Sequence, residues 1–363
     1  MNADIATDER AERGSHATGT GAMEGALKSG IARRISVAPM MDWTDRHCRY
    51  FLRGFSPRVL LYTEMITAAA IVRGDRARLL QHSVEEQPLA LQLGGNDPKL
   101  LATAARAGAD RGYREINLNC GCPSDRVHAG AFGACLMLEP RQVAEGVAAM
   151  RAAVSVPVTV KMRIGVVSAG AARGDAIAQF DEADYDRLRT FTETVAAGGC
   201  ERFIVHARKA VLGGLSPREN REVPPLRFDI VQRLGSDLPR LAFEVNGGLR
   251  TATECTDALT WSAGIMLGRE AYHRPFLLSE LQRLVFDAGW VGPPPAQLLE
   301  RMARYAEHEV AAGERLSAIT RHMLGLCAGR PGARRYRQWL SAGARADPDP
   351  HYLLRAAASL CEA

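Results

Sequence analysis

Short runs of apolar and β-branched residues recur along the chain from residue 35 onward, and each run is bounded by turn signals. These runs predict eight strands, at 35–39, 59–64, 89–93, 115–119, 157–162, 202–206, 241–246 and 264–267. Alanine-rich segments with helical periodicity lie between most of them, at 97–111, 140–153, 184–198 and 251–261. Because strands separated by helices pair in parallel, the pattern predicts an α/β fold.

Two parallel architectures fit this alternation, a (β/α)8 TIM barrel and a doubly wound sheet. The β/α units run from residue 31 to about 275, close to the roughly 250 residues of a barrel. Residues with polar groups or special backbone freedom stand at or just past the end of each strand: Asp42, Glu64, Gln92, Asn119, Lys161, His206, Asn246 and Gly268. A barrel brings all of these ends to one face, so their placement favours the barrel.

The prolines Pro293, Pro294 and Pro295 mark a domain boundary, because three consecutive prolines cannot continue a helix. Helical periodicity resumes over 296–324 and 334–341 with no strand-like run. We therefore predict a TIM-barrel catalytic domain at 31–290 and a C-terminal all-helical domain at 291–363. Residues 1–30 are polar and lack the apolar segment of a secretory signal, which predicts a disordered N-terminal tail on a cytoplasmic protein.

Composition narrows the class of protein. The chain has 363 residues, 47% hydrophobic and 24% charged, as globular proteins do. No apolar run approaches the 18 or so residues of a membrane span, so we expect no membrane association. Arginines outnumber acidic residues over 321–363, which indicates a basic patch for a polyanion such as RNA; a solvated helix face is the alternative.

The chain has 8 cysteines, and no pair has the C-x-x-C spacing of a zinc ribbon. We therefore expect no structural metal. A disulfide framework is unexpected in a chain of this length without a signal peptide, so most cysteines should be buried thiols.

Glycine-containing turns after the last two strands suggest a phosphate site. Asn246, Gly247 and Gly248 follow one strand, and Gly268 and Arg269 follow the next. Glycines let backbone N–H groups approach a phosphate, and barrels commonly bind phosphate at these two loops. Ordinary loop glycine is the alternative.

Two cationic or polar side chains also end strands. Lys161 ends the fifth strand, where it could pair with a phosphate, form a Schiff base or stabilise negative charge on a reduced flavin. A surface lysine is the alternative. His206 ends the sixth strand, and alternation places it on the same side as Arg208, which favours an anionic or hydrogen-bonding ligand there.

Cys122 is the candidate catalytic residue. It follows the fourth strand in a turn rich in Gly and Pro, where a thiol can be exposed rather than packed. With a free pKa of about 8.5, such a thiol is mostly protonated near neutrality and can serve as a general acid. A redox pair with Cys120 is the alternative, although a Cys-Gly-Cys bridge would close a very small, strained loop.

Several segments together resemble the A branch of the tRNA-dihydrouridine synthases, a family of flavoproteins. The resemblance covers about 31–341 and is carried by segments at 38–45, 91–95, 117–124, 130–137, 160–165, 206–226, 246–248, 268–272, 321–326 and 331–334. Cys120 departs from the family pattern, which usually has an aliphatic residue there. The resemblance implies an FMN-bearing barrel, a helical tRNA-binding domain, and NADPH-dependent reduction of the uridine C5–C6 bond in the tRNA D-loop, at positions 20 and 20a.

The resemblance also implies roles for individual residues. Hydride from FMN N5 would go to C6 of the uracil, and Cys122 would give a proton to C5. Residues expected to bind the cofactor are Pro39, Met40, Met41, Gln92, Lys161, His206, Asn246, Gly247, Gly248, Gly268 and Arg269. Residues expected to contact tRNA are Asn119, Arg221, Arg334 and Arg337.

Two other functions remain open. One is a flavin barrel acting on a free pyrimidine, as in the dihydroorotate dehydrogenases, which needs neither a helical appendage nor an arginine cluster. The other is a non-catalytic tRNA-binding protein that merely retains the barrel. We expect a monomer in each case.

Overall fold

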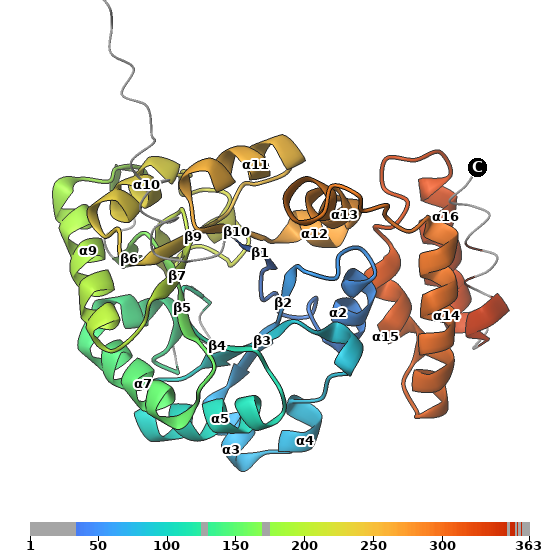
Figure 1. The fold of residues 1–363 in the computed structure, drawn as a ribbon, viewed down its shortest axis with the longest axis horizontal. Coiled ribbons are helices and arrows are strands. Elements are labelled where there is room, and N and C mark those ends of the chain that lie inside the picture. Colours follow the sequence, from blue (N-terminus) through green and yellow to red (C-terminus); the bar gives the residue numbers. More distant parts are fainter. Residues whose placement is uncertain are drawn as a thin grey trace, which may run out of the picture.

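The computed structural model describes residues 34–124, 130–168, 175–346, 349–352, 354 and 357. Its centre is a closed parallel barrel with the strand order β1-β10-β9-β7-β5-β4-β3-β2. Figure 1 shows helices around the outside of this barrel and a separate group of helices beside it. The prediction of a TIM barrel is therefore confirmed, and the doubly wound alternative is wrong.

In the described part of the chain, the barrel strands are β1 (Arg34–Val37), β2 (Leu60–Thr67), β3 (Leu89–Gly94), β4 (Glu115–Cys120), β5 (Val158–Arg163), β7 (Arg202–His206), β9 (Ala242–Asn246) and β10 (Gly264–Leu267). Each lies within a few residues of a predicted strand. The sheet closes because β1 pairs in parallel with β10 on one side and with β2 on the other.

The helices that surround the barrel are α2 (Arg46–Arg53), α3 (Ala68–Arg73), α4 (Arg76–Leu79), α5 (Pro98–Asp110), α7 (Pro140–Ala153), α8 (Asp175–Ala178), α9 (Glu182–Ala197), α10 (Phe228–Asp237), α11 (Ala252–Trp261), α12 (Arg269–His273) and α13 (Phe276–Leu281). Short 3-10 turns lie at η1 (Val84–Glu86), η2 (Gly133–Leu138) and η4 (Glu219–Arg221), and a π-helical turn lies at η5 (Gln282–Phe286).

Local sequence explains where these helices begin. Asp97 caps α5 by accepting hydrogen bonds from the amides of Lys99 and Leu100, and Pro98 supplies the fixed φ suited to a first helical residue. Thr251 and Glu254 form a capping box at the start of α11. These signals lie within the sequence itself, which is why the helix starts were predictable.

Side chains of the barrel strands are buried on both faces. In β3, Leu89, Leu91 and Leu93 belong to the large core between strands and helices, whereas Ala90 packs inside the barrel. Tyr62 and Ile204 fill the same interior from other strands. Because both faces are covered, these strands read as apolar runs rather than as alternating patterns.

One small sheet was not predicted. It pairs β6 (Val166–Ser168) in parallel with β8 (Ala210–Leu212), outside the barrel. Both strands have three residues, too few to show a period of two. They extend the chain beyond β5 and β7, on the side of the barrel where these strands end.

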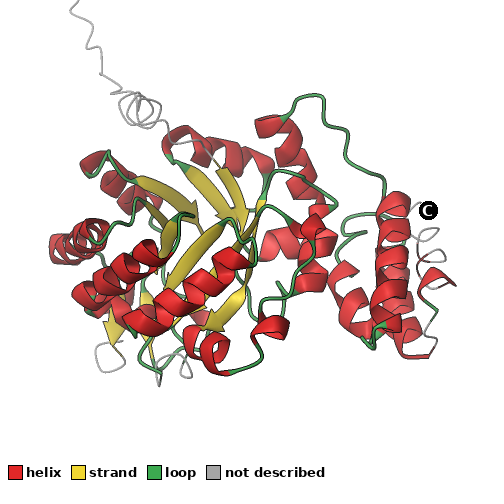
Figure 2. Ribbon diagram, turned by 60° about the horizontal axis from the view of Figure 1, so that its bottom comes forward, coloured by secondary structure: helices red, strands yellow, loops and turns green. Residues whose placement is uncertain are grey.

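No strand lies among the described residues after 294, whose helices include α14 (Pro295–Ala311), α15 (Leu316–Thr320), η6 (Arg321–Met323) and α16 (Ala333–Ala346). Figure 2 shows this group joined to the barrel by an extended loop. The helical pattern expected over 296–324 is broken after Ala311, where Gly313 adopts a φ of 98° that ends the helix. None of the helices in the described ranges is both long enough and apolar enough to cross a bilayer.

The expectation that most cysteines are buried thiols holds for Cys48, Cys120, Cys200 and Cys255, while Cys122 and Cys135 are free but partly exposed. Cys327 is disulfide-bonded. Spacing along the chain does not reveal a disulfide, because the fold decides which cysteines come within bonding distance.

Candidate active site

The ends of the parallel strands bring the predicted residues to one mouth of the barrel. The register pairs Asn119 on β4 with Lys161 on β5, and His206 on β7 with Asn246 on β9. Because neighbouring residues in a parallel register point the same way, these side chains form a continuous polar rim. Pairing of the strands thus brings together residues that are up to 127 positions apart in the sequence.

Asn119 holds the segment that carries Cys122. Its Oδ1 atom accepts hydrogen bonds from the backbone amides of Gly121 and Cys122, both at 3.0 Å. Its Nδ2 atom donates to Oε1 of Gln92 at 2.8 Å. The side chain is 8% exposed, and both of its polar atoms have partners within the protein.

A chain of buried polar side chains supports Asn119 from below. Gln92 donates to Asn117 at 2.7 Å, and Asn117 donates to the hydroxyl of Thr159 at 2.8 Å. Thr159 in turn donates to Glu115 at 2.6 Å. A satisfied buried network has few alternative arrangements, so it fixes the orientation of the amide groups at the mouth.

The Cys122 thiol lies at the partly exposed mouth. Its Sγ atom is 3.5 Å from the hydroxyl oxygen of Ser124. The charges of Lys161 and Arg163, both on β5, and of Arg221, in η4, act on Cys122, so this thiol lies in a cationic environment. Cys120, by contrast, is fully buried, and burial raises the pKa of its thiol. The two cysteines thus occupy different environments.

Lys161 is directed to the next strands of the rim. Its Nζ atom donates to Oδ1 of Asn246 at 3.1 Å, and Nδ2 of Asn246 donates to the carbonyl of Met266 at 2.7 Å. Burial, together with the neighbouring Arg163, lowers the pKa of Lys161 to about 7. Burial disfavours the charged form of Lys161, and a bound anion would stabilise that form.

Arg163 was not among the residues that the sequence predicted for the site. It is 3% exposed and ties three segments together through backbone carbonyls: those of Gly121 at 3.2 Å, Lys209 at 3.2 Å and Asn220 at 2.9 Å. Burial lowers its pKa to about 9. The signal was available, because a period of two on β5 places Arg163 on the same side as Lys161.

His206 is also buried, and its pKa lies well below the usual value because of burial and the nearby Arg163 and Lys161. The ring is therefore neutral at physiological pH and can offer a hydrogen bond rather than a charge. Gly247 approaches this ring closely: a Cβ at that position would lie 2.6 Å from Cδ2 of His206.

The glycines after β9 and β10 have different surroundings: Gly247 and Gly248 pack against Leu226, whereas Gly268 borders open space. Gly247 and Gly248 have φ angles of 107° and 72°, which favour glycine. A Cβ placed on Gly268 would meet no atom within 4 Å, so space is open above it. Arg269 stands beside this space and pairs with Glu222 at 2.9 Å, on an exposed rim where the pair can rearrange. These features suit a phosphate group.

The loop after β1 supplies the apolar part of the mouth. Met40 packs against the cluster inside the barrel, while Met41 is exposed. The amide of Met40 donates to the hydroxyl of Thr44 at 2.9 Å. Asp42 adopts a left-handed φ of 63°, and its amide donates to the carboxylate of Glu64. Pro39 belongs to the same loop, which is ordered by these contacts.

The predicted tRNA contacts fall into two places. Arg221, in η4, lies close enough to Cys122 and Arg269 to interact electrostatically with both. Arg334 and Arg337 lie on α16 in the helical group, and both are exposed. The structure thus separates a cationic mouth on the barrel from a basic helix outside it.

A parallel barrel with a thiol, buried cations and open space at Gly268 at one mouth has the architecture of a TIM-barrel enzyme. Comparison with known families is more specific. The family model described as dihydrouridine synthase (Dus) matches residues 36–360, and the chain belongs to this family.

Individual relatives are similar over most of their length. A protein of Pseudomonas syringae pv. tomato named tRNA-dihydrouridine(20/20a) synthase is 49% identical over 337 residues, which are 92% of this chain and 96% of the relative. Proteins of the same name from Synechocystis sp. and Vibrio cholerae are 52% and 50% identical, over 85% and 86% of this chain and 88% and 91% of the relatives.

Among solved structures, a complex of 2-naphthoyl-CoA reductase has a similar fold. The TM-score is 0.53 with 8% sequence identity, and the match covers 71% of this chain and 51% of the other. At this identity the likeness concerns the fold alone.

Proposed function

We propose that this protein is a tRNA-dihydrouridine synthase that reduces the C5–C6 bond of uridine in the D-loop of tRNA, at positions 20 and 20a, with NADPH as reductant. The names of the relatives and membership of the family support this reaction. The single observation that carries it is the Cys122 segment, fixed by Asn119 at a mouth lined by Lys161, Arg163 and Arg221.

The residues of the mouth fit FMN as the cofactor. The open surface at Gly268, with Arg269 beside it, suits the phosphate, and the partly buried Met40 suits one face of a flavin ring. Lys161, Asn246 and the neutral His206 offer donors and acceptors to the polar edge of that ring. Bound FMN, once reduced by NADPH, supplies the hydride that the C6 atom of uracil requires.

The chain's own residues account for the remaining steps. Cys122 holds a proton on Sγ and donates it to C5 of the uracil as general acid. Asn119 keeps the backbone of that residue in place, and Arg163 fixes the neighbouring carbonyl of Gly121. The target base must leave its stack to reach this site, so the cations at the mouth would hold the flanking phosphates.

We assign tRNA binding outside the mouth to the helical domain at 291–363, with Arg334 and Arg337 as phosphate contacts and Arg221 as a contact at the barrel. The exposed position of both arginines on α16 supports this assignment. We propose that the protein acts in the cytoplasm as a monomer, where its tRNA substrate is found.

A genetic experiment tests the reaction and the position together. Dihydrouridine would be mapped in tRNA from a strain that lacks this gene and from the same strain with the gene restored. We expect dihydrouridine at positions 20 and 20a to disappear and return. Unchanged tRNA would contradict the proposal, and release of FMN from the denatured protein would then indicate a flavin barrel for a free pyrimidine.

A further inference from the structure

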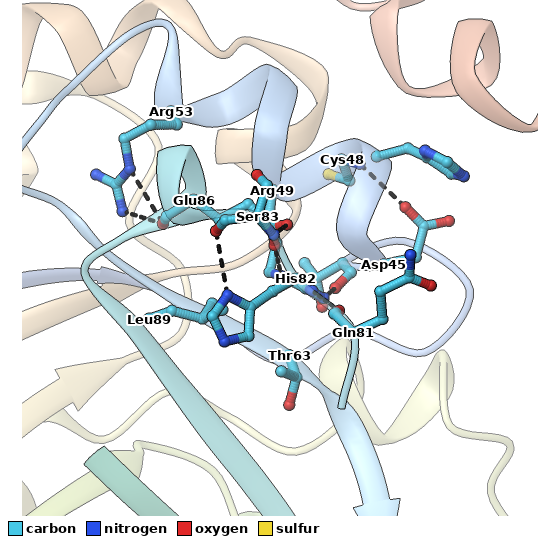
Figure 3. A network of polar contacts seen from close by, with 12 residues as sticks. Asp45, Cys48, Arg49, Arg53, Thr63, Gln81, His82, Ser83, Glu86 and Leu89 are labelled. Carbon is cyan, nitrogen blue, oxygen red and sulfur yellow. Dashed lines mark hydrogen bonds and ion pairs between the residues drawn. The ribbon is translucent and has the colours of Figure 1, made fainter. Parts of the chain in front are cut away.

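The helical group contacts the barrel at the loop that lines the candidate cofactor site. Asp45 ends this loop and caps α2 by accepting a hydrogen bond from the amide of Cys48 at 3.0 Å, as Figure 3 shows. Its second carboxylate oxygen accepts hydrogen bonds from Arg321 at 2.8 Å and from Nε2 of His322 at 3.0 Å. Both of these residues belong to η6, in the helical group.

His322 also reaches the loop after β10. Its Nδ1 atom lies 3.1 Å from the hydroxyl oxygen of Tyr272 on α12, the short helix that follows Gly268. Tyr272 stacks on Trp43 with ring centroids 4.4 Å apart. One imidazole from the helical group therefore contacts the two barrel loops that follow the neighbouring strands β1 and β10.

This contact is buried and charged. The side chain of His322 is fully enclosed, and that of Asp45 is 23% exposed. Hydrogen bonds from His322, Cys48 and Arg321 hold the pKa of Asp45 well below its usual value. The carboxylate is thus ionised at neutral pH, and hydrogen bonds to a charged group of limited exposure are among the stronger ones.

The barrel supports the same loop from the opposite side. Arg49 on α2 donates to the carbonyl of Thr44 at 2.8 Å and forms a buried ion pair with Glu86 at 2.7 Å, and both residues are visible in Figure 3. The backbone amides of Trp43 and Thr44 bond to the carbonyl of Met40 at 3.1 and 2.9 Å. The loop is therefore held by Arg49 within the barrel and by Asp45 through the helical group.

We propose that His322 and Arg321 are positioning residues, through which the helical domain sets the conformation of the loop at 39–45 that lines the cofactor site. This inference rests on the proposed function, because that function makes the loop at 39–45 part of a cofactor site. Its geometry does not depend on the reaction. It means that a domain assigned to tRNA binding also completes the barrel's cofactor pocket when no tRNA is bound.

Hydrogen exchange in the flavin-free full-length protein tests this directly. In His322→Ala we expect the amides of Trp43 and Thr44 to exchange about 10-fold faster or more, because a charged hydrogen bond to Asp45 is lost. Amides within α9, which Figure 1 shows on the far side of the barrel from the helical group, should keep their exchange rates. Arg304→Gln, which removes the exposed pair with Glu300 in the same helical group, is the matched control and should leave the loop unchanged.

Conservative variants separate the two contacts of His322. Glutamine can place a donor near the position of Nε2 and should restore slow exchange, whereas asparagine mimics Nδ1 and should not. If His322→Ala fails to fold, Arg321→Gln tests the same carboxylate from a more exposed residue. The variants that exchange faster should also bind FMN about 10-fold more weakly in the absence of tRNA. Quenching of flavin fluorescence would measure this affinity.

Unchanged exchange at Trp43 and Thr44 in folded His322→Ala and Arg321→Gln would overturn the inference. Because exchange is measured without flavin, tRNA or reductant, this outcome is independent of whether the protein makes dihydrouridine. A strain experiment that fails to find dihydrouridine would contradict the proposed function and leave the exchange result standing.

Discussion

The side chain of Asn119 accepts a hydrogen bond from the backbone amide of Cys122 at 3.0 Å and a second from Gly121 at the same distance. The resemblance to the family implies that Asn119 contacts the target nucleotide, and that role stays a prediction. The geometry adds another role, because a side chain that binds two successive amides determines where the next side chain points.

The two roles of Asn119 predict different kinetics. If Asn119 mainly positions Cys122, Asn119→Ala should lower kcat by about 10- to 100-fold with little change in KM for tRNA, because misplacement affects the reacting geometry. Asn119→Asp keeps an acceptor for both amides and should retain more activity. Steady-state kinetics with purified tRNA would measure this, and a raised KM with unchanged kcat would favour the nucleotide contact instead.

Cys122→Ala should reduce dihydrouridine formation by about 100- to 10,000-fold, the range typical of positioned proton transfer. Flavin content should not change, since Gly268, Arg269 and Lys161 are untouched. Cys135→Ala is the control, because the Cys135 thiol already donates a hydrogen bond to the backbone carbonyl of Phe132 at 3.1 Å. Full activity of Cys122→Ala with flavin bound and tRNA in excess would exclude this residue as the acid.

Lys161 should titrate near neutrality in the flavin-free protein, since burial and Arg163 lower its pKa to about 7. Raising the pH through this value removes the positive charge, so affinity for an anionic ligand should fall above pH 7; conversely, a bound anion should raise the pKa. The 15Nζ resonance of Lys161 would report the titration, with the exposed Lys99 as internal control. A Lys161 midpoint near that of Lys99 without ligand would contradict this prediction.

The basic helix α16 should contribute to tRNA affinity through phosphates. The double variant Arg334→Ala, Arg337→Ala should bind tRNA more weakly. The slope of log K against log salt should fall by about 1 to 2, because counterions are no longer released at the phosphates that these arginines contacted. Arg189→Ala, on the barrel helix α9, is a control for net charge. Filter binding across a salt series would measure the slope, and an unaltered slope would remove both arginines from the interface.

The ion pair between Arg49 and Glu86 should matter for stability. Both residues are buried, and Arg49→Leu would leave the carboxylate of Glu86 without its cation, which typically costs about 3–5 kcal/mol. Glu193→Gln breaks an exposed pair and should change the free energy of unfolding by less than about 1 kcal/mol. Urea denaturation of the flavin-free protein compares the two, and equal small effects would contradict a supporting role for Arg49.

The sequence by itself determined the barrel. Strand and helix positions follow from local apolar periodicity and from caps such as Asp97 and Thr251, and these signals depend only on neighbouring residues. The sequence also showed that Gln92, Asn119, Lys161, His206 and Asn246 end strands, so their meeting at one mouth follows once a closed parallel sheet is assumed.

Only the tertiary structure decided how these residues interact. Asn119 bonds the Cys122 segment, Arg163 bonds carbonyls of three segments, and His322 reaches Asp45 across 277 positions of sequence. Such contacts depend on the relative placement of loops and domains, which no local pattern encodes. The pKa values of Lys161 and His206 likewise follow from burial and from neighbouring cations, and these exist only after folding.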